Sequence, residues 1–443
     1  MSPSPLHLIP LGGSGEIGMN LNLYGTAGRW LMVDCGISFE RTPGGSTRVV
    51  MPDLRAFRHD AHNLVGIVIT HIHEDHIGAV VDLWPQLRAP VHCTPFAAAM
   101  LRLKLRDAGY ADDAVPIHVH PVGSRWQLGP FDLQTLGITH STAESTSVLI
   151  RTDAATVLHT GDFKLDPGPM LGPATDLDAF SALAPVDICV SDSTNALLPG
   201  RSASEATAAK RLRERVAGCR HRVVVATFAS NLARLQSIAA AATATGRHLV
   251  VLGRSLHRMI RAARDAGYFQ DFPPILPPDD VGFLPRDKVM IIATGTQAEP
   301  GAALTRIASD QHRDIRLEPG DTVLFSSKII PGNEDDVALL HARLRDLGCR
   351  VVSEREDATI HASGHPCQDE LSELYDAVQP RCVVPVHGTP QHLRGHAAFA
   401  RSRGLHAVEV RNGDVLHLGP GEVRRTGEVS TGRVRRDERP QRR

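Results

Sequence analysis

The strongest chemical signal in the sequence is a segment with three histidines and two acidic residues within six positions: His71, His73, Glu74, Asp75 and His76. It directly follows the apolar run Leu64–Ile69, which predicts a buried strand. In extended backbone, side chains two residues apart project to the same side, so His71 and His73 face one point. Asp75 and His76 open the next predicted helix and can face a second point nearby. Because imidazole and carboxylate groups without thiolates suit Zn²⁺ or Mn²⁺, the segment predicts a metal site.

The elements that must position this segment are predicted to be short strands separated by tight turns. Residues with high strand propensity, bounded by Gly or Asp, predict strands at seven places: Leu6–Leu11, Asn20–Tyr24, Trp30–Val33, Val65–Thr70, Phe131–Leu136, Ser147–Arg151 and Thr156–His159. Helical patterns lie among them at Ile77–Leu87 and Ala97–Asp107. The histidine-rich segment therefore joins a strand to a helix.

Regular alternation of strand and helix begins at about Ala203. Four predicted strands are each followed by a predicted helix: Arg222–Thr227, His248–Leu252, Val289–Ala293 and Thr322–Phe325. Strands separated by helices of this length predict a parallel sheet with helices on its faces. A final block repeats the theme, with a strand at Cys382–Val386, a helix at Gln391–Ala400 and a strand at Ala407–Val410.

The composition excludes several classes of protein. The chain has 443 residues, 42% apolar and 22% charged, which is enough for two or three globular domains. No apolar run reaches the ~18–20 residues of a membrane helix, so no membrane partner is predicted. Met1–Pro10 lacks the pattern of a secretion signal. The seven cysteines are scattered and never in Cys-x-x-Cys spacing, which favours a reducing, cytoplasmic setting.

The distribution of charge leaves one segment open to two interpretations. The net charge is −1, so no attraction of the whole molecule to nucleic acid is predicted. The segment 421–443 nevertheless carries eight arginines: Arg424, Arg425, Arg433, Arg435, Arg436, Arg439, Arg442 and Arg443. We expect it to be a disordered, solvated tail, with a phosphate-binding arm as the alternative.

The segment His71–His76 has the pattern H-x-H-x-D-H and resembles the metal-binding motif of the metallo-β-lactamase fold. Further segments narrow the resemblance to bacterial ribonuclease J, a two-metal nuclease family with a β-CASP domain inserted into a metallo-β-lactamase domain. These segments are Leu11–Asn20, Ser191–Asn195, Ala226–Asn231, Val251–Ser255, Thr294–Pro300, Pro331–Glu334, His361–His365 and Pro385–Gly388. The resemblance covers about Leu6 to Leu418.

The resemblance implies an α/β fold, namely a metallo-β-lactamase αββα sandwich with an inserted parallel α/β β-CASP domain. Residues 1–202 are expected to form the first part of the metallo-β-lactamase domain and residues 203–350 the insertion. Residues 351–420 are expected to complete the first domain, and residues 421–443 to form the Arg-rich tail.

A ligand set for two divalent cations is also implied, with Zn²⁺ expected and Mn²⁺ or Mg²⁺ as alternatives. One cation is expected to be bound by His71, His73 and His140. The other is expected to be bound by Asp75, His76 and His387. Asp162 is expected between the cations, because the two oxygens of a carboxylate can bind one cation each. Asp34 is expected to steady the ligand loop.

Two further residues match β-CASP motifs that flank the metals in the family. The resemblance implies that Asp192 and His365 give a proton to the leaving 3′ oxygen of a phosphodiester. Each has a plainer interpretation. Asp192 can cap the turn formed with Ser193 and Thr194, and His365 can be a loop histidine held by its neighbours.

Binding of the substrate's terminal phosphate is implied for two small segments: Ser230 and Asn231; His361, Ala362, Ser363, Gly364 and His365. Small residues expose backbone N–H groups and hydroxyls, which suit an anion. Ser230 and Asn231 also precede a predicted helix, whose N-terminus attracts phosphate. Ordinary helix capping is the alternative for Ser230.

Some features depart from the family pattern. The loop after His140 reads Ser-Thr-Ala-Glu-Ser, where Pro and Asp are expected. The family's further carboxy-terminal domain, which is tied to oligomer assembly, matches no segment of this sequence, although a homodimer or tetramer is still suggested. Aromatic residues make up only 4%, which favours recognition of the RNA backbone over base stacking.

The predicted function is hydrolysis of single-stranded, 5′-monophosphorylated RNA by a 5′→3′ exonuclease, with endonucleolytic cleavage as a second mode, in RNA processing and decay. A β-CASP nuclease acting on DNA is one alternative, because contacts to the 2′-hydroxyl cannot be read from the sequence. A thioester or lactone hydrolase would need no inserted domain over its cleft. An inactive RNA-binding subunit would be expected to lack ligands, whereas all seven candidates are present.

Overall fold

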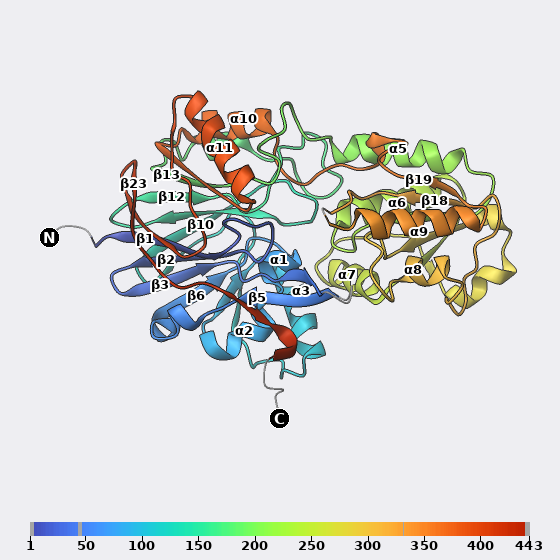
Figure 1. The fold of residues 1–443 in the computed structure, drawn as a ribbon, viewed down its shortest axis with the longest axis horizontal. Helices are drawn as coiled ribbons and strands as arrows, with labels where there is room; N and C mark the ends of the chain where they lie inside the picture. Colours follow the sequence, from blue (N-terminus) through green and yellow to red (C-terminus); the bar gives the residue numbers. More distant parts are fainter. Residues whose placement is uncertain (1–3, 43–46, 331, 439–443) are drawn as a thin grey trace.

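The protein is represented by a computed structural model that describes residues 4–42, 47–330 and 332–438. Two sheet-based parts lie side by side in Figure 1. The first part uses both ends of the chain and contains two large sheets, whereas the second uses the middle of the chain and contains one.

The first large sheet brings the beginning and the end of the described chain together. Its eight strands lie in the order β23-β22-β1-β2-β3-β6-β7-β8. In that order their bounds are Glu422–Glu428, Asp414–Gly419, Leu6–Gly12, Leu21–Thr26, Arg29–Val33, Leu64–Val68, Val91–Cys93 and Ile117–Val119. Strands β1 and β22 pair antiparallel, with Leu6 opposite Leu418. The terminal block therefore completes this sheet.

The second large sheet carries most of the strands that end at candidate site residues. Its order is β21-β20-β13-β12-β11-β10-β9. The bounds are His406–Ala407, Cys382–Val386, Ile188–Asp192, Thr156–His159, Thr146–Arg151, Phe131–Gly137 and Arg125–Leu128. β12, β13 and β20 run parallel, so their carboxyl ends meet at one edge.

Helices cover the outer faces of both sheets, and the space between the sheets is an apolar core. Leu8 and Val68 of the first sheet belong to one buried cluster with Val148 and Val384 of the second. The helices α1 (Glu74–Ile77), α2 (Val80–Leu87) and α3 (Pro95–Asp107) pack on the outer face of the first sheet. The helices α4 (Leu177–Ser181), α10 (Gln368–Val378) and α11 (Pro390–Ser402) pack on the outer face of the second. This arrangement is the αββα sandwich expected from the sequence.

The inserted part is a six-stranded sheet in which every neighbouring pair is parallel, in the order β16-β15-β17-β14-β18-β19. The strands are Ile275–Leu276, His248–Leu252, Val289–Ala293, Val223–Ala226, Thr322–Phe325 and Arg350–Val352. The helices α5 to α9 are Glu205–Ala217, Leu232–Ala244, Arg254–Asp265, Ala303–Ala308 and Glu334–Asp346. Because β19 spans residue 350, the sheet extends beyond the predicted boundary; the boundaries themselves stay predictions.

The expectation of a disordered tail at 421–443 does not hold for residues 422–438. β23 is the edge strand of the first sheet, and β24 (Arg433–Arg435) pairs with β5 (Thr47–Pro52). β5 in turn pairs with β4 (Ser38–Arg41), which gives a small three-stranded sheet. The backbone groups of this segment pair with the edges of strands β22 and β5. The high charge of the segment favoured a solvated tail and gave no indication of this pairing. Residues 439–443, with the last three arginines, lie outside the described residues.

Two local expectations also differ from the structure. The helix expected at Ile77–Leu87 is divided, because α1 ends at Ile77 and α2 starts at Val80. The strand expected at Ala407–Val410 is limited to His406–Ala407. Short 3₁₀ helices occupy Arg55–Phe57, Ala61–Asn63, Pro278–Phe283, Arg286–Lys288, Ala358–Ile360 and Arg436–Glu438.

Among the described residues, no helix has the length and apolar character that crossing a membrane requires.

Candidate active site

The histidine-rich segment is held in place by a buried aspartate from the neighbouring strand. Asp34 directly follows β3 and has a left-handed backbone with φ 63°. Its Oδ1 accepts a hydrogen bond from the backbone N–H of Thr70 at 2.8 Å. Its Oδ2 lies 2.7 Å from Nδ1 of His76. Asp34 therefore orients the start and the end of the loop, as expected, and belongs to none of the groups that could hold a metal ion.

The structure brings the seven candidate ligands into two groups, each with ligand atoms within 4.8 Å of one another. The first group is His71, His73, His140 and Asp162, and the second is Asp75, His76, Asp162 and His387. These are the two sets expected from the sequence, with Asp162 shared between them. Their roles as ligands stay predictions, whereas their convergence is a property of the fold.

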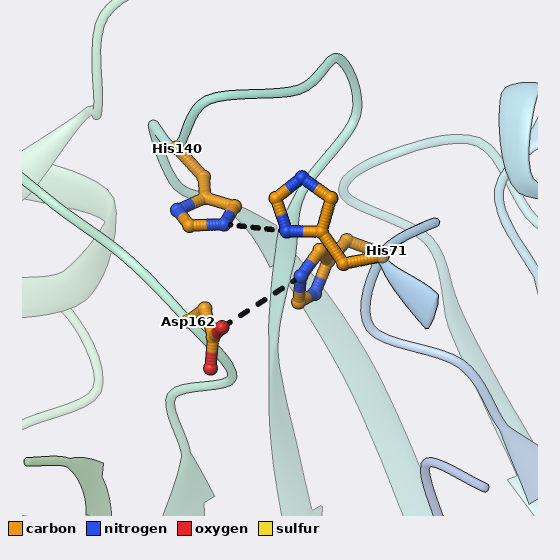
Figure 2. Close-up of side chains that lie close together, drawn as sticks. His71, His140 and Asp162 are labelled. Carbon is orange, nitrogen blue, oxygen red and sulfur yellow. Dashed lines mark hydrogen bonds and ion pairs between the residues drawn. The ribbon is translucent and has the colours of Figure 1, made fainter. Parts of the chain in front are cut away.

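In the first group, three imidazoles and one carboxylate converge from three elements (Figure 2). His71 and His73 follow β6, His140 follows β10, and Asp162 follows β12. Nε2 of His140 lies 3.0 Å from Nδ1 of His73. Nε2 of His71 lies 3.9 Å from Oδ2 of Asp162 and makes no hydrogen bond within the described part of the chain.

In the second group, the two oxygens of Asp162 face different histidines. Oδ2 lies 3.1 Å from Nε2 of His76, and Oδ1 lies 2.7 Å from Nδ1 of His387. His387 follows β20 and has φ 52°, and its Nε2 lies 3.2 Å from Oδ2 of Asp75. A carboxylate with its oxygens directed to two neighbouring groups is suited to join two cations.

The protonation states of the first group fit a divalent cation. Burial holds the pKa of His71 well below its ordinary value, and it holds the pKa of His140 low in the same way. Burial also lowers the pKa of His73 to about 4. Burial alone would raise the pKa of Asp162, but His387 and His76 outweigh it and keep this pKa well below the ordinary value. Neutral imidazoles, a carboxylate and the unpaired nitrogen of His71 are together the donor set that Zn²⁺ or Mn²⁺ takes. In the second group, burial alone would lower the pKa values of His76 and His387, but Asp162 outweighs it and raises both, to about 10 for His387.

Asp192 and His365 form a hydrogen-bonded pair beside the shared carboxylate. Asp192 ends β13, and its Oδ2 lies 2.7 Å from Nδ1 of His365. His365 is in turn 3.9 Å from Oδ2 of Asp162. The other oxygen of Asp192 accepts hydrogen bonds from the backbone N–H and the hydroxyl of Thr194. The turn-capping interpretation and the pairing with His365 are therefore both realised, one on each oxygen.

The segment His361–His365 packs directly against the first ligand group. Nδ1 of His140 lies 2.6 Å from the carbonyl oxygen of Gly364, and a Cβ added at Gly364 would lie 2.6 Å from Cε1 of His140. Only glycine allows this close approach. Asn195 donates to the hydroxyl of Ser363 at 2.8 Å and to the carbonyl of His365 at 3.2 Å. Ala362 is buried, and His361 is half-buried.

Ser230 and Asn231 lie at the start of α6 rather than in either ligand group. Oδ1 of Asn231 accepts a hydrogen bond from the backbone N–H of Arg234 at 2.8 Å, which is ordinary N-capping. Within the described residues, no hydrogen bond joins Ser230 or Asn231 to the segment 361–365.

Arg234 connects these two segments, and the sequence interpretation missed it. Its guanidinium donates to the carbonyl of Ile360 at 2.9 Å and to Ser326, and it forms an ion pair with Glu205 at 2.9 Å. Arg234 is the one charged residue in the helix Leu232–Ala244, and its side chain is fully buried. A single charge in an otherwise uncharged helix was the available signal.

A glycine-rich loop from the start of the chain closes the site near His387. The backbone N–H of Gly15 donates to the carbonyl of Gly388 at 3.0 Å. The next residue, Glu16, is held by Asn412 at 2.7 Å and by Arg433 at 2.6 Å. Arg433 belongs to β24, so the segment expected to be a loose tail instead braces a loop beside the site.

Glu144, in the departing loop after His140, connects the two parts of the molecule. One oxygen accepts from the backbone N–H of Phe96, at the start of α3, at 2.7 Å. The other accepts from the hydroxyl of Tyr268, just after α7, at 3.0 Å. Glu144 and Tyr268 also line a cavity of about 620 Å³ that reaches His140.

Comparison with known proteins follows this division of the chain. Residues 20–217 match the model of the metallo-beta-lactamase superfamily, and residues 220–344 match "Ribonuclease J, beta-CASP domain". Residues 356–410 match "Zn-dependent metallo-hydrolase RNA specificity domain". A solved structure of a protein of unknown function from Enterococcus faecalis V583 has a TM-score of 0.65 at 13% identity, covering 94% of this chain and 100% of that chain. That likeness concerns the fold alone.

Curated relatives extend over nearly the whole chain. A ribonuclease J of Sinorhizobium meliloti is 42% identical over 98% of this chain and 78% of the relative. A ribonuclease J of Mycolicibacterium smegmatis is 40% identical over 98% of this chain and 78% of the relative. Fold and site thus define a metallo-β-lactamase-fold, metal-dependent hydrolase with a β-CASP insertion. The chain belongs to the ribonuclease J family, and it is a ribonuclease of RNA processing.

Proposed function

We propose that the chain is a two-cation ribonuclease that removes nucleotides from the 5′ end of single-stranded, 5′-monophosphorylated RNA and can also cut internally. The observation that carries this proposal is the pair of ligand groups that share Asp162. His71, His73 and His140 would hold one cation, and Asp75, His76 and His387 would hold the other. Two bound divalent cations supply a nucleophile at neutral pH and relieve negative charge on the phosphate. Zn²⁺ is the expected ion, with Mn²⁺ or Mg²⁺ as alternatives.

The chain's own residues then supply the proton for the leaving oxygen. Asp192 fixes the ring of His365 through Nδ1, so Nε2 is the atom left to hold a proton toward the substrate. Burial lowers the pKa of His365, but Asp192 outweighs this effect and raises the pKa above its ordinary value. A raised pKa favours the protonated imidazole, which can give its proton to the departing 3′ oxygen of the RNA.

Binding of the terminal phosphate is proposed for residues 361–364 together with Ser230 and Asn231. The support is chemical: both segments consist largely of small residues that offer backbone N–H groups and hydroxyls, and the half-buried Ser230 directly precedes the N-cap of the 13-residue helix α6. Exonuclease rates on 5′-monophosphate and 5′-hydroxyl RNA test this assignment. Equal rates would remove it without affecting the metal proposal.

The metal proposal is tested with Asp162→Asn and His76→Ala. We expect both variants to lose RNA hydrolysis and to bind less zinc or manganese in equilibrium dialysis, with circular dichroism unchanged. His59→Ala, at an exposed histidine outside the groups, is the matched control. Wild-type turnover in both variants would refute the two-cation mechanism, and digestion of matched RNA and DNA strands decides the sugar preference.

A cytoplasmic setting is also proposed. The support is that all seven cysteines are free and six of them are buried. The homodimer or tetramer suggested by the family resemblance stays a prediction, which light scattering on the purified chain checks.

A further inference from the structure

Helix α7 of the inserted part carries a continuous basic face. Its exposed or half-buried arginines recur every three or four residues and so share one side of the helix: Arg254, Arg258, Arg261 and Arg264. The opposite side is apolar and buried, with Leu256, Met259 and Ile260 in the core. From Arg254 to Arg264 the face is ~15 Å long, at 1.5 Å per residue.

Much of this charge has no partner within the described part of the molecule. Arg254 and Arg261 are exposed and form no ion pair with any described residue. Arg264 lies over the ring of Phe272, with 5.8 Å between the guanidinium carbon and the ring centroid. Asp265 is the one acidic residue of the helix. A face of this kind stands out in a chain whose net charge is −1.

The basic face continues across the boundary between the two parts onto α3. Arg258 forms an ion pair with Asp107, the last residue of α3, at 2.6 Å. One turn earlier, Lys104 is bound to Glu74. Arg102 is exposed and has no ion pair among the described residues. α3 and α7 lie side by side in Figure 1, at the lower side of the junction.

Glu74 connects this surface to the candidate active site. It lies between the candidate ligands His73 and Asp75 in the sequence, and it opens α1. Two ion pairs therefore connect the ligand loop to the basic face of α7. The first joins Glu74 to Lys104 of α3, and the second joins Asp107 of α3 to Arg258 of α7. Through α3, the unpaired arginines of α7 are thus connected to the ligand loop.

We propose that the exposed face of α7 and α3 binds the phosphate backbone of the RNA segment that lies outside the catalytic cleft. This inference rests on the proposed function, because it takes the cleft's substrate to be a long RNA strand. Arginine is suited to the task, since its planar guanidinium makes charge-assisted hydrogen bonds to phosphate. The contacts are to the backbone and carry no sequence preference, in keeping with the scarcity of aromatic residues.

The test compares RNA lengths in the double variant Arg254→Gln/Arg261→Gln. For 5′-monophosphorylated RNA of about 30 nucleotides, we expect KM to rise about 10-fold near physiological salt, with kcat unchanged. The slope of log(kcat/KM) against log salt should become shallower by about 1.4, or ~0.7 for each lost phosphate contact on a single strand. RNA of about five nucleotides, too short to reach the face, should be cleaved as by the wild type.

The matched control is Arg213→Gln/Arg220→Gln, which removes two exposed arginines in and after α5. α5 lies at the top of the inserted part in Figure 1, away from α7. An equal loss in this control would show an effect of net charge alone and would overturn the proposal. So would an unchanged KM for long RNA, or an equal loss on both lengths; the face would then serve another partner, such as an acidic protein segment. If the wild type cleaves neither RNA, the proposed function fails, and fluorescence anisotropy with the long RNA still tests the face.

Discussion

The buried arginine of α6 offers the sharpest test of how the inserted part is held together. The change is Arg234→Met, which keeps an extended side chain and removes the charge. Arg234 and Glu205 have 0% and 1% of their side chains exposed and form an ion pair at 2.9 Å. The guanidinium also binds the carbonyl of Ile360 and the hydroxyl of Ser326. The side chain of Arg234 therefore joins α6 to three other segments of the chain.

The magnitude follows from the charge that is left behind. Removing one member of a buried ion pair costs about 3–5 kcal/mol, because the other charge stays without compensation. In this chain the Oε1 atom of Glu205 already has no hydrogen-bond partner within the described residues, so no second donor is available. We therefore expect Arg234→Met to lower the free energy of unfolding of the inserted part by about 3–5 kcal/mol.

The assay is urea unfolding followed by circular dichroism. Tryptophan fluorescence is a poor probe here, because the three tryptophans, Trp30, Trp84 and Trp126, all lie in the first part of the molecule. Fluorescence can serve instead as an internal reference for the sandwich. Arg213→Gln, an exposed change on α5, should stay within about 0.5 kcal/mol of the wild type.

A double variant separates the lost ion pair from lost packing. Replacing both charges, as in Glu205→Leu/Arg234→Leu, should cost clearly less than the sum of the two single changes, because no charge is left buried alone. A loss below about 1 kcal/mol for Arg234→Met, or strict additivity in the double variant, would refute the reasoning.

Three further predictions concern other parts of the chain. Deleting residues 421–443 removes β23 and β24 and should lower the melting temperature in calorimetry; an unchanged melting temperature would contradict the bracing role of this segment. Tyr268→Phe removes the hydrogen bond to Glu144 and should cost about 1 kcal/mol in urea unfolding, and an unchanged midpoint would argue against that bond. Burial raises the pKa of Asp357, but Thr359, Arg215 and Arg211 outweigh it and hold this pKa below its ordinary value. The stability advantage of the wild type over Asp357→Asn should therefore be complete above the unfolded pKa of about 3.9 and shrink as the pH falls below it; an advantage that grows on acidification would contradict the ion pairing.

Local spacing allowed the histidine-rich loop to be predicted, but not the partners that meet it. His71 and His73 are two residues apart on one loop, so strand geometry alone places them together. His140, Asp162 and His387 come from three distant strand ends, and nothing in their own neighbourhoods says that these ends converge. The family resemblance supplied that information. Its physical basis is the parallel pairing of β12, β13 and β20 for Asp162 and His387. β10, which precedes His140, runs in the same direction because β11 pairs antiparallel with both β10 and β12.

Prediction from the sequence failed for the segments whose structure depends on contacts with residues far away along the chain. Residues 422–438 are rich in arginine and looked solvated, yet they add edge strands to β22 and β5. The buried position of Arg234 depends on Glu205 and Ile360, which lie far from it along the chain. Propensity and periodicity describe neighbours in sequence, so they cannot reveal where a distant edge or a distant charge will be available.

The late position of β20 has a consequence for the timing of synthesis. A growing polypeptide that already carries His71 and Asp162 still lacks His387, and β22, which pairs with β1, is added later still. The cluster is therefore incomplete on the ribosome until residue 387 has been added. A shorter nascent chain cannot assemble both ligand groups.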